Sequence, residues 1–324
     1  MNIVKTLITA IILVFSIVVT AQQKYAIVIH GGAGVMSKEK MTEEQQSNYA
    51  AKLNEALNLG EKMLKEGANA TDVVVKVINV LEDSPLFNAG KGAVFTHDEK
   101  VELDASIMDG KNLNAGAVAG VRDIKNPINA ALEVMINSKH VFLSGEGASE
   151  FAKKQKLEIV PNNYFYTDSR FESLMKLKKR ERERTRQDNT GTVGCAVLDT
   201  KGNIAAGTST GGMTNKKYGR IGDAPVIGAG TYANNKTCAV SCTGHGEYYI
   251  RLAFARDVSA LMEYKNLSVE EACREEIRKL SELNGTGGVI ALDNEGNIAM
   301  EFNTSGMFRG YLKSSGEREV AIFK

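Results

Sequence analysis

The chain is short of the residues and of the charge that mark several common classes of protein. Its 324 residues include four cysteines and four histidines, and its formal net charge is +1. The cysteine spacing is not that of a disulfide framework, and the histidines lack the spacing of zinc ligands. A charge so near zero argues against a large nucleic-acid interface. What remains is a globular protein, which the 43% hydrophobic and 24% charged composition also favours.

The first residues have the pattern of a signal peptide. A short, positively charged start over residues 1–5 precedes an apolar run over residues 7–19. The run is short for a membrane span, no basic stop-transfer cluster follows it, and small residues lie before Gln22. We therefore expect residues 1–21 to be removed on export, to the periplasm or the medium, leaving a chain over 22–324 without a membrane anchor.

Hydrophobic periodicity predicts a series of helices and strands, and the length of the chain permits one large domain or two ordinary ones. Helices are expected over residues 42–66, 71–81, 127–135, 247–263 and 268–283. Strands are expected over residues 25–29, 102–109, 117–121, 193–198, 203–208, 238–243, 288–292 and 297–302. Strand blocks interspersed with paired helices favour sheet layers that are covered by helices. Cys238 and Cys242 share one face of a predicted strand, so we expect buried free thiols there.

A charged segment separates the two halves of the chain. Residues 176–188 read KLKKRERERTRQD and contain hardly any apolar side chains. Such a composition is typical of a solvated helix or a disordered linker, and we expect a flexible, exposed linker over about residues 165–190. Glu181 and Glu183 interrupt the basic charge and no aromatic residue lies between them, which disfavours a nucleic-acid arm.

The stretch after this linker carries the strongest indication of chemistry. Asn189-Thr190-Gly191-Thr192 opens an apolar run that reads as a buried strand. If the peptide bond before Thr192 were cut, the hydroxyl of Thr192 would lie beside its own free α-amine. One residue would then supply both a nucleophile and a base. A Gly-Thr pair alone is also an ordinary turn before a strand, so the interpretation depends on the motifs that follow.

Three polar motifs follow in the second half. They are a hydroxyl-rich strand end over 208–215, a glycine loop with Arg220 and Asp223, and a glycine-rich strand end over 241–247. Arg220 and Asp223 can hold the carboxylate and amine of an α-amino acid or pair with each other, and taken alone they favour the internal pair. The hydroxyl and N–H groups of residues 241–247 can form an oxyanion site or a plain turn into a helix.

Together with motifs upstream, these segments match one family. The chain resembles the plant-type L-asparaginases/isoaspartyl aminopeptidases, which are N-terminal-nucleophile (Ntn) hydrolases that mature by self-cleavage. The similarity runs from residue 26 to about residue 310. It rests on eight motifs in register, namely HGGAG (30–34), PLFNAGKGAVF (85–95), ELDASIMDG (102–110), GTVG (191–194), TSTGGMTN (208–215), GRIGD (219–223), GAGTYANN (228–235) and SCTGHGE (241–247).

The resemblance implies a fold, a maturation step and an activity. The fold would be a single domain over residues 22–324, the four-layer αββα sandwich of the Ntn hydrolases, in the α+β class. Cleavage between Gly191 and Thr192 would give an α chain of residues 22–191 and a β chain of residues 192–324, and two αβ pairs would associate as an (αβ)2 heterotetramer. The activity would be hydrolysis of L-asparagine and β-aspartyl (isoaspartyl) dipeptides to L-aspartate, with no cofactor in catalysis.

The resemblance also assigns roles to individual residues. Thr192 would attack the side-chain amide carbon with its α-amine as general base, and Thr210 would hydrogen-bond this nucleophile. Arg220 and Asp223 would grip the α-carboxylate and α-amine of the substrate. Oxyanion, substrate-lining and supporting contacts are implied for Thr243, Gly244, Gly246 and Asn88. A structural sodium ion is implied in the loop over 81–91, at Leu81, Glu82, Ser84, Phe87, Ala89 and Lys91.

Two alternatives stay open. Glycosylasparaginase shares the fold and the nucleophile, and the expected export favours it, but its nucleophile usually follows a His-Asp string that this chain lacks. An exported amino-acid-binding protein would use Arg220 and Asp223 equally well. Such a protein would have no use for Gly191 and Thr192 at the end of a charged linker.

Overall fold

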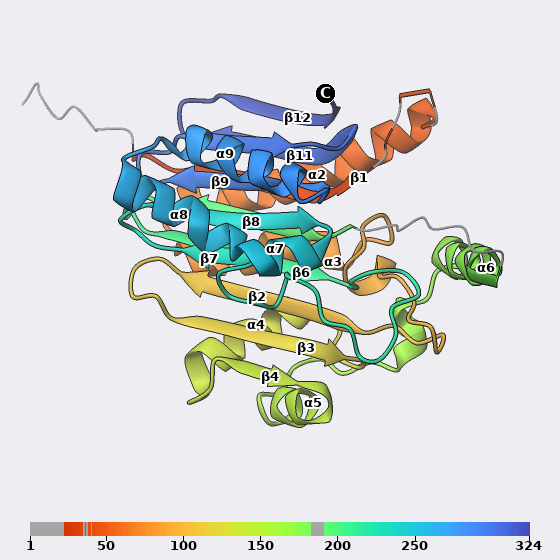
Figure 1. Ribbon diagram of the computed structural model, residues 1–324. Helices are drawn as coiled ribbons and strands as arrows, with labels where there is room; N and C mark the ends of the chain where they lie inside the picture. The colour runs from red at the N-terminus through yellow and green to blue at the C-terminus, as the bar shows by residue number, and fades with distance from the viewer. Residues whose placement is uncertain (1–22, 35, 37, 40, 183–190) are drawn as a thin grey trace, which may run out of the picture.

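The computed structural model describes residues 23–34, 36, 38–39, 41–182 and 191–324 (Figure 1). The expected signal peptide and the last part of the expected linker lie outside these residues. Within them, the chain forms two β-sheets that pack face to face between layers of helices. No helix in the described part of the chain has both the length and the apolar content needed to cross a membrane.

The larger sheet contains strands from both halves of the chain. Its strands are β1 (Ala26–Gly34), β2 (Leu103–Asp109), β3 (Ala115–Val121), β4 (Phe142–Ser144), β5 (Val193–Leu198), β6 (Ile204–Thr210), β11 (Gly306–Lys313) and β12 (Arg318–Phe323). Their order across the sheet is β12-β11-β1-β5-β6-β2-β3-β4. Neighbours are antiparallel except β3 and β4, which are parallel. The strand that follows Thr192, β5, therefore lies inside the sheet with a partner on each side.

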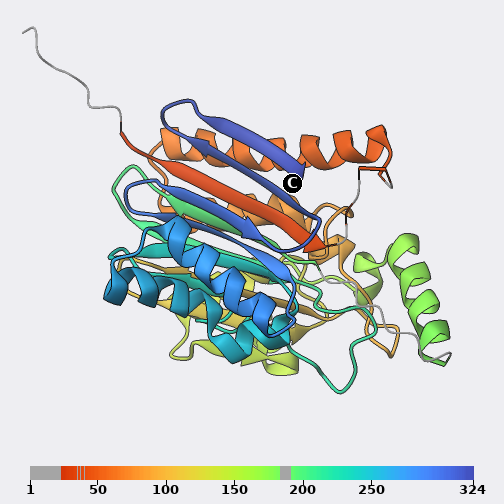
Figure 2. The ribbon, with the colours of Figure 1, turned by 45° about the horizontal axis from the view of Figure 1, so that its top comes forward.

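The smaller sheet comes entirely from the second half of the chain. Its strands are β7 (Thr231–Ala233), β8 (Cys238–Gly244), β9 (Gly287–Asp293) and β10 (Ile298–Phe302), in the antiparallel order β10-β9-β8-β7. Strands β8 and β9 lie over β1, β5 and β6 of the larger sheet (Figures 1 and 2).

Helices cover the two outer faces. The larger sheet is covered by α2 (Glu43–Lys65), α3 (Ala70–Glu82) and α4 (Pro127–Asn137), and α5 (Gly145–Lys154) packs at its β4 edge. The smaller sheet is covered by α7 (Gly246–Leu252), α8 (Phe254–Lys265) and α9 (Val269–Glu282). Capping boxes at Thr42 and Ser268 define where α2 and α9 begin. The expected four-layer αββα sandwich is confirmed.

The period-two alternation of the strands divides the core into three layers. On β1, Ile27 and Ile29 pack under the outer helices, whereas Ala26 and Val28 face the smaller sheet. On β8, Cys238 and Cys242 pack under α8 and α9. All four cysteines are buried and free, as the sequence predicted for Cys238 and Cys242. Because the faces are assigned so clearly, polar residues at inward-facing positions must find partners between the sheets.

One predicted helix is divided in two. The pattern predicts a single helix over 247–263, but α7 ends at Leu252 and α8 begins at Phe254. Ala253 between them has φ +49° and ψ +42°, a left-handed conformation that ends a helix. Tyr249 and Phe254, on either side of this break, are fully buried with ring centroids 4.7 Å apart. Burial of both rings offsets the unfavourable backbone conformation.

The segment expected to be a flexible linker is helical over most of the described part. It contains α6 (Asp168–Arg182) and is preceded by a 3-10 helix, η2 (Asn162–Phe165), which ends at the first residue of the segment. Phe165 and Leu174 are fully buried, and the Phe171 ring lies edge-on to Phe95 with centroids 5.5 Å apart. These few apolar side chains anchor the segment despite its charge. Residues 183–190, the remainder of the expected linker, lie outside the described residues.

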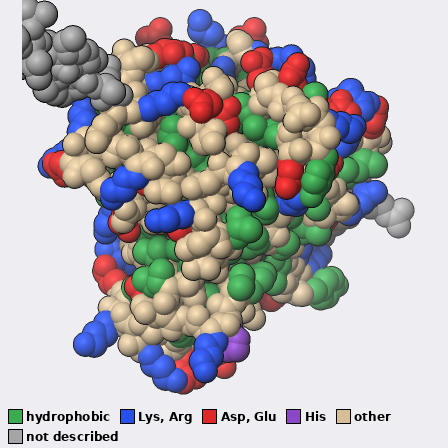
Figure 3. Space-filling view, turned by 90° about the vertical axis from the view of Figure 1, so that its left-hand side faces the viewer, with side chains coloured by type: hydrophobic (Ala, Val, Ile, Leu, Met, Phe, Trp, Pro, Cys, Tyr) green, Lys and Arg blue, Asp and Glu red, His purple; other side chains and the backbone are tan. Residues whose placement is uncertain are grey.

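The two ends of the sandwich differ. At the right-hand end of Figure 1 lie α6 and the last residues of β1, and the strand register brings the first residue of β5 and the last of β6 to the same end. At the opposite end, basic and acidic side chains are interspersed with hydrophobic ones (Figure 3). Residues of HGGAG, GTVG and TSTGGMTN therefore meet at the end that carries α6, whereas the last part of GAGTYANN lies beside the start of β6, at the opposite end.

Candidate active site

Thr192 lies immediately before β5, beside the ends of β1 and β6. Its side chain is buried, and its Oγ1 donates to the carbonyl oxygen of Gly191 at 2.7 Å. Thr192 Oγ1 also lies 3.2 Å from Oγ1 of Thr210, the last residue of β6. Every residue of β5 is buried, so Thr192 is carried on a rigid strand. The structure thus brings together Thr192 and Thr210, as the family resemblance implied.

The carbonyl oxygen of Gly191 is surrounded by hydrogen-bond donors. Besides the Thr192 hydroxyl, it accepts from Asn88 Nδ2 at 2.8 Å and from Thr210 Oγ1 at 2.9 Å. Thr210 Oγ1 in turn accepts from the backbone N–H of Gly212 at 2.9 Å. Donors aimed at a carbonyl oxygen stabilise the negative charge that develops on it when the carbon is attacked. The arrangement therefore suits attack on the peptide group that precedes Thr192.

Asn88 is held in one orientation by bonds to both ends of its amide. Its Oδ1 accepts from the backbone N–H of Val94 at 2.9 Å, and its Nδ2 also donates to the carbonyl of Gly212 at 2.8 Å. A Cβ on Gly211 would lie 2.6 Å from Asn88 Oδ1, so only glycine leaves room there. These contacts direct the amide nitrogen toward Gly191.

Asn88 belongs to the loop over 81–91, and two glycines that follow it lie against main-chain carbonyl oxygens of the loop. Just after Asn88 the chain forms the 3-10 turn η1 (Gly90–Gly92). A Cβ on Gly90, whose φ is +50°, would lie 2.3 Å from the Glu82 carbonyl oxygen, and one on Gly92 would lie 2.2 Å from that of Phe87. The Glu82 side chain is engaged elsewhere, because it accepts from Ser209 Oγ at 2.6 Å. Main-chain carbonyl oxygens are a ligand type that hard cations prefer, so the loop offers donors of the right chemistry for such an ion.

Arg220 forms its ion pair with Glu247 rather than with Asp223. Its Nε donates to Glu247 Oε1 at 2.8 Å and its Nη2 donates to Oε2 at 2.9 Å. The motif alone predicted an ion pair between Arg220 and Asp223, and that prediction is wrong. Glu247 lies in the first turn of α7 and presents both carboxylate oxygens to the planar guanidinium fork, which favours this bidentate geometry.

Asp223 is left with unused hydrogen-bonding capacity beside this pair. It is buried, and its Oδ2 has no hydrogen-bond partner among the described residues. Burial raises the pKa of Asp223 to about 7, although the nearby Arg220 charge acts in the opposite direction. A Cβ on Gly246 would lie 2.7 Å from Asp223 Oδ1 and 2.9 Å from Arg220 Nη2. Glycine at 246 thus allows α7 to approach, and the cation and the carboxyl group form one small polar site.

Thr243 and Gly244 end β8 close to Thr192. The backbone N–H of Ala33 donates to Thr243 Oγ1 at 3.3 Å. The adjoining Gly32 lies against the Gly191–Thr192 peptide group, since a Cβ there would be 3.3 Å from Gly191 Cα and 3.4 Å from the Thr192 nitrogen. Gly244 has φ +151°, and a Cβ on it would lie 2.4 Å from the carbonyl oxygen of Thr286. The backbone at 244 can therefore take this course only as glycine.

A row of buried polar side chains between the sheets was missed by the sequence analysis. His30 bonds the carbonyl of Thr192 through Nδ1 at 3.1 Å and Ser241 Oγ through Nε2 at 2.9 Å, and Ser241 continues to Thr208 at 2.7 Å. Burial lowers the pKa of His30 to about 3, so the ring is neutral. A Cβ on Gly194 would lie 2.0 Å from Ser241 Oγ, so glycine is needed there. Strand alternation could have identified the row, because His30 and Thr208 occupy inward-facing positions.

A buried charge cluster beneath Thr210 was also missed. Asp104 pairs in register with Thr210 across β2 and β6, and its carboxylate lies 4.0 Å from the buried Lys216 Nζ. Lys216 also donates to the carbonyl of Glu102 at 3.2 Å. Asp104 lies in ELDASIMDG and Lys216 directly follows TSTGGMTN, but only the sheet register shows that these motifs meet.

Comparisons with known proteins agree with this geometry. The model of the family described as Asparaginase matches residues 23–322. The isoaspartyl peptidase of Escherichia coli K12 is 50% identical over 310 residues, which cover 93% of this chain and 97% of the relative. A probable isoaspartyl peptidase/L-asparaginase 2 of Arabidopsis thaliana is 44% identical, over 93% of this chain and 99% of the relative. A putative isoaspartyl peptidase/L-asparaginase of Dictyostelium discoideum is 44% identical, over 90% of this chain and 94% of the relative.

Proposed function

The chain belongs to the asparaginase family, and on that premise we propose that it is a hydrolase that releases L-aspartate from β-aspartyl dipeptides and L-asparagine. The observation that carries this proposal is the contact between Thr192 and Gly191. The Thr192 hydroxyl lies against the preceding carbonyl group, whose oxygen also accepts from Asn88 and Thr210. A nucleophile, the bond it would cut and the groups that would stabilise the resulting charge are in one place.

Maturation would begin with attack of Thr192 Oγ1 on the carbonyl carbon of Gly191. The C–N bond to Thr192 breaks as an ester forms between Gly191 and the threonine oxygen, and the nitrogen takes up a proton. Water then hydrolyses the ester, which leaves a carboxylate on Gly191 and a free α-amine on Thr192. Asn88 and Thr210 would stabilise the oxyanion in both steps.

The mature site would repeat this chemistry on the substrate. The α-amine of Thr192 would remove the proton from the Thr192 hydroxyl, and the resulting oxygen would attack the side-chain carbonyl carbon of the β-aspartyl group. The ester formed with Thr192 would then be hydrolysed by water, which releases L-aspartate. Thr243 and Gly244 would stabilise the oxyanion, with Thr210 hydrogen-bonded to the nucleophile. Arg220 would bind the α-carboxylate of the substrate. Asp223 Oδ2, which has no hydrogen-bond partner in the described part of the chain, would bind its ammonium.

The family relationship disfavours both alternatives. The relatives named above are isoaspartyl peptidases and L-asparaginases, which favours that activity over glycosylasparaginase. A non-catalytic binding protein would have no need for the donors that surround the Gly191 carbonyl.

The proposal is tested by intact mass and N-terminal sequencing of the purified protein after incubation at neutral pH. We expect a new N-terminus at Thr192 and a second chain that ends at Gly191. The cleaved protein should then release L-aspartate from β-aspartyl-leucine and from L-asparagine. A protein that stays uncut and releases no aspartate from either substrate would contradict both parts of the proposal.

Three further properties belong to the same proposal. A sodium ion would be held by the loop over 81–91, chiefly through main-chain oxygens, and would keep Asn88 in place without taking part in catalysis. Two αβ pairs would associate as an (αβ)2 heterotetramer. Removal of residues 1–21 on export would place the enzyme in the periplasm or the medium. The main-chain oxygens of Glu82 and Phe87, against which Gly90 and Gly92 lie, support the first of these by their chemistry.

The burial of Asp223 leads to a pH-dependent preference for substrates with an α-amine. Because the pKa of Asp223 is raised to about 7, the group is a neutral acid below that pH and a carboxylate above it. Only the carboxylate attracts an ammonium group. The ratio of kcat/KM for L-asparagine to that for succinamate, which lacks the amine, should therefore rise roughly tenfold between pH 6 and pH 7.5.

Taking a ratio removes the contribution of the Thr192 amine, which titrates identically for both substrates. In Asp223→Asn the ratio should be low and independent of pH. A ratio that stays constant in the wild-type enzyme over this range would contradict the role given to Asp223.

A further inference from the structure

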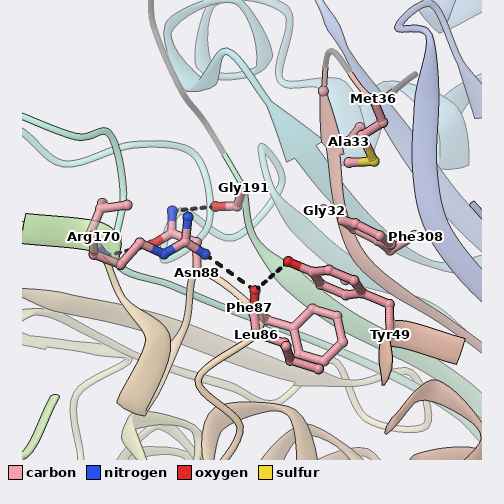
Figure 4. Close-up of a pocket in the computed structure, with 13 residues that line it drawn as sticks. Gly32, Ala33, Met36, Tyr49, Leu86, Phe87, Asn88, Arg170, Gly191 and Phe308 are labelled. Atoms are coloured by element: carbon pink, nitrogen blue, oxygen red, sulfur yellow. Dashed lines mark hydrogen bonds between the residues drawn. The ribbon is translucent and has the colours of Figure 1, made fainter. Parts of the chain in front are cut away.

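A cavity of about 190 Å³ lies beside Gly191, between β1, the loop over 81–91 and α6 (Figure 4). One wall is aromatic. The Tyr49 and Phe308 rings are stacked with centroids 4.0 Å apart, and Phe87 lies edge-on to Tyr49 at 5.5 Å. Asn88 and Gly191 line the cavity at the scissile group, whereas Arg220 and Asp223 do not line it. The cavity is thus a second space next to Thr192, separate from the Arg220–Asp223 site.

Arg170, from the first turn of α6, is the cation of this cavity. Its Nε donates to the carbonyl of Gly92 at 2.8 Å and its Nη2 donates to that of Leu86 at 3.3 Å, so both acceptors are neutral. Among the described residues, no carboxylate lies within ion-pair distance of this guanidinium. A guanidinium has five N–H donors, so three remain for a ligand.

The environment of Arg170 favours an anion. Burial lowers the pKa of Arg170, since the surrounding protein leaves its charge poorly solvated. A carboxylate bound at the remaining donors would compensate that charge with charge-assisted hydrogen bonds. The aromatic wall beside it suits an apolar group on the same ligand.

Proton transfer from the Thr192 amine determines which part of the substrate lies in this cavity. The Thr192 amine must return its proton to the nitrogen that leaves the substrate, so that nitrogen must come within hydrogen-bond reach of the amine. In the uncut chain the Thr192 nitrogen is bonded to Gly191, which lines the cavity. Once the bond is cut and Gly191 moves away, the leaving part of the substrate occupies the vacated space.

We propose that this cavity is the subsite for the amino acid released from β-aspartyl dipeptides, with Arg170 binding its α-carboxylate and the Tyr49–Phe308 pair contacting its side chain. The inference rests on the proposed function and specifies the substrate for it. A dipeptide with a free C-terminal carboxylate and an apolar second residue uses the whole subsite. L-Asparagine releases only ammonia and makes no use of it.

The test compares substrates on the cleaved enzyme and on two variants. In Arg170→Gln, the ratio of kcat/KM for β-aspartyl-leucine to that for L-asparagine should fall roughly 10- to 100-fold, through a higher KM for the dipeptide. Lys176→Gln, which removes an exposed cation from the same helix, should leave the ratio at the wild-type value. An equal loss on both substrates in Arg170→Gln would overturn the proposal, because Arg170 would then only hold the loop at Leu86 and Gly92.

A second comparison needs no variant. The wild-type enzyme should have a KM for β-aspartyl-leucine that is roughly 10- to 100-fold below that for β-aspartyl-leucinamide, which lacks the carboxylate. Equal KM values for acid and amide would overturn the subsite while leaving the hydrolase activity intact. Failure of the proposed function is distinct, since no aspartate would then appear from any of these substrates.

Discussion

Replacing Thr192 with alanine is expected to leave the protein as a single uncut chain without hydrolase activity. The substitution removes the hydroxyl that lies 2.7 Å from the Gly191 carbonyl oxygen and would act in both self-cleavage and catalysis. Loss of a nucleophile reduces turnover by roughly 10³-fold or more. Intact mass should show one species that spans Gly191 and Thr192, and release of aspartate should fall to background.

Thr192→Ser is the matched control. It keeps the hydroxyl but loses the methyl group that helps to fix the rotamer, so it should cleave more slowly and retain partial activity. If Thr192→Ala instead matured to two chains, another group would have to be the nucleophile of cleavage, and the roles given to Thr210 and Asn88 would be wrong as well.

Replacing Asn88 with alanine is expected to produce the second largest effect, a self-cleavage rate that is roughly 10²- to 10³-fold lower. The alanine variant loses the N–H donor at 2.8 Å from the Gly191 carbonyl oxygen, which would stabilise the charge formed on attack. The measurement is the conversion of precursor to two chains over time, followed on denaturing gels from freshly purified protein.

Asn88→Asp distinguishes polarisation from loop support. This variant keeps an oxygen to accept from the Val94 N–H, but it places a carboxylate oxygen against the Gly191 carbonyl. It should therefore cleave as slowly as the alanine variant. Cleavage of Asn88→Asp at the wild-type rate would mean that Asn88 acts only by holding the loop.

Local pattern was sufficient for much of the fold. The apolar run over 193–198 predicted that β5 is a buried strand, and the spacing of Cys238 and Cys242 predicted that both thiols lie on one face of β8. The contact between Thr210 and Thr192 followed from the family resemblance instead, because it joins residues 18 positions apart in the chain. No local pattern indicates that the helix predicted over 247–263 divides at Ala253, since alanine favours the continuation of a helix. The break depends instead on the burial of the Tyr249 and Phe254 rings, which is a tertiary contact.

The ion-pair partner of Arg220 could not be predicted from the local sequence. Within the loop, Asp223 is the nearest carboxylate in sequence, and the pattern favoured that pair. The first turn of α7 brings Glu247 to the guanidinium instead, and no local rule predicts this approach. The same holds for His30, since its bond to Ser241 joins two sheets through residues 211 positions apart. Contacts of this kind follow from topology rather than from local composition.

The strand order of the larger sheet has a consequence for refolding. Cleavage after Gly191 would assign β1, β2, β3 and β4 to one chain and β5, β6, β11 and β12 to the other, yet β1 lies between β11 and β5, and β6 pairs with β2. The two fragments would be interleaved within a single sheet, whereas the precursor folds as one molecule. Once unfolded, the cut enzyme would have to reassemble from two separate chains, in a second-order reaction that slows with dilution. The covalent link that self-cleavage would remove would thus be needed only once, during the first folding of the sheet.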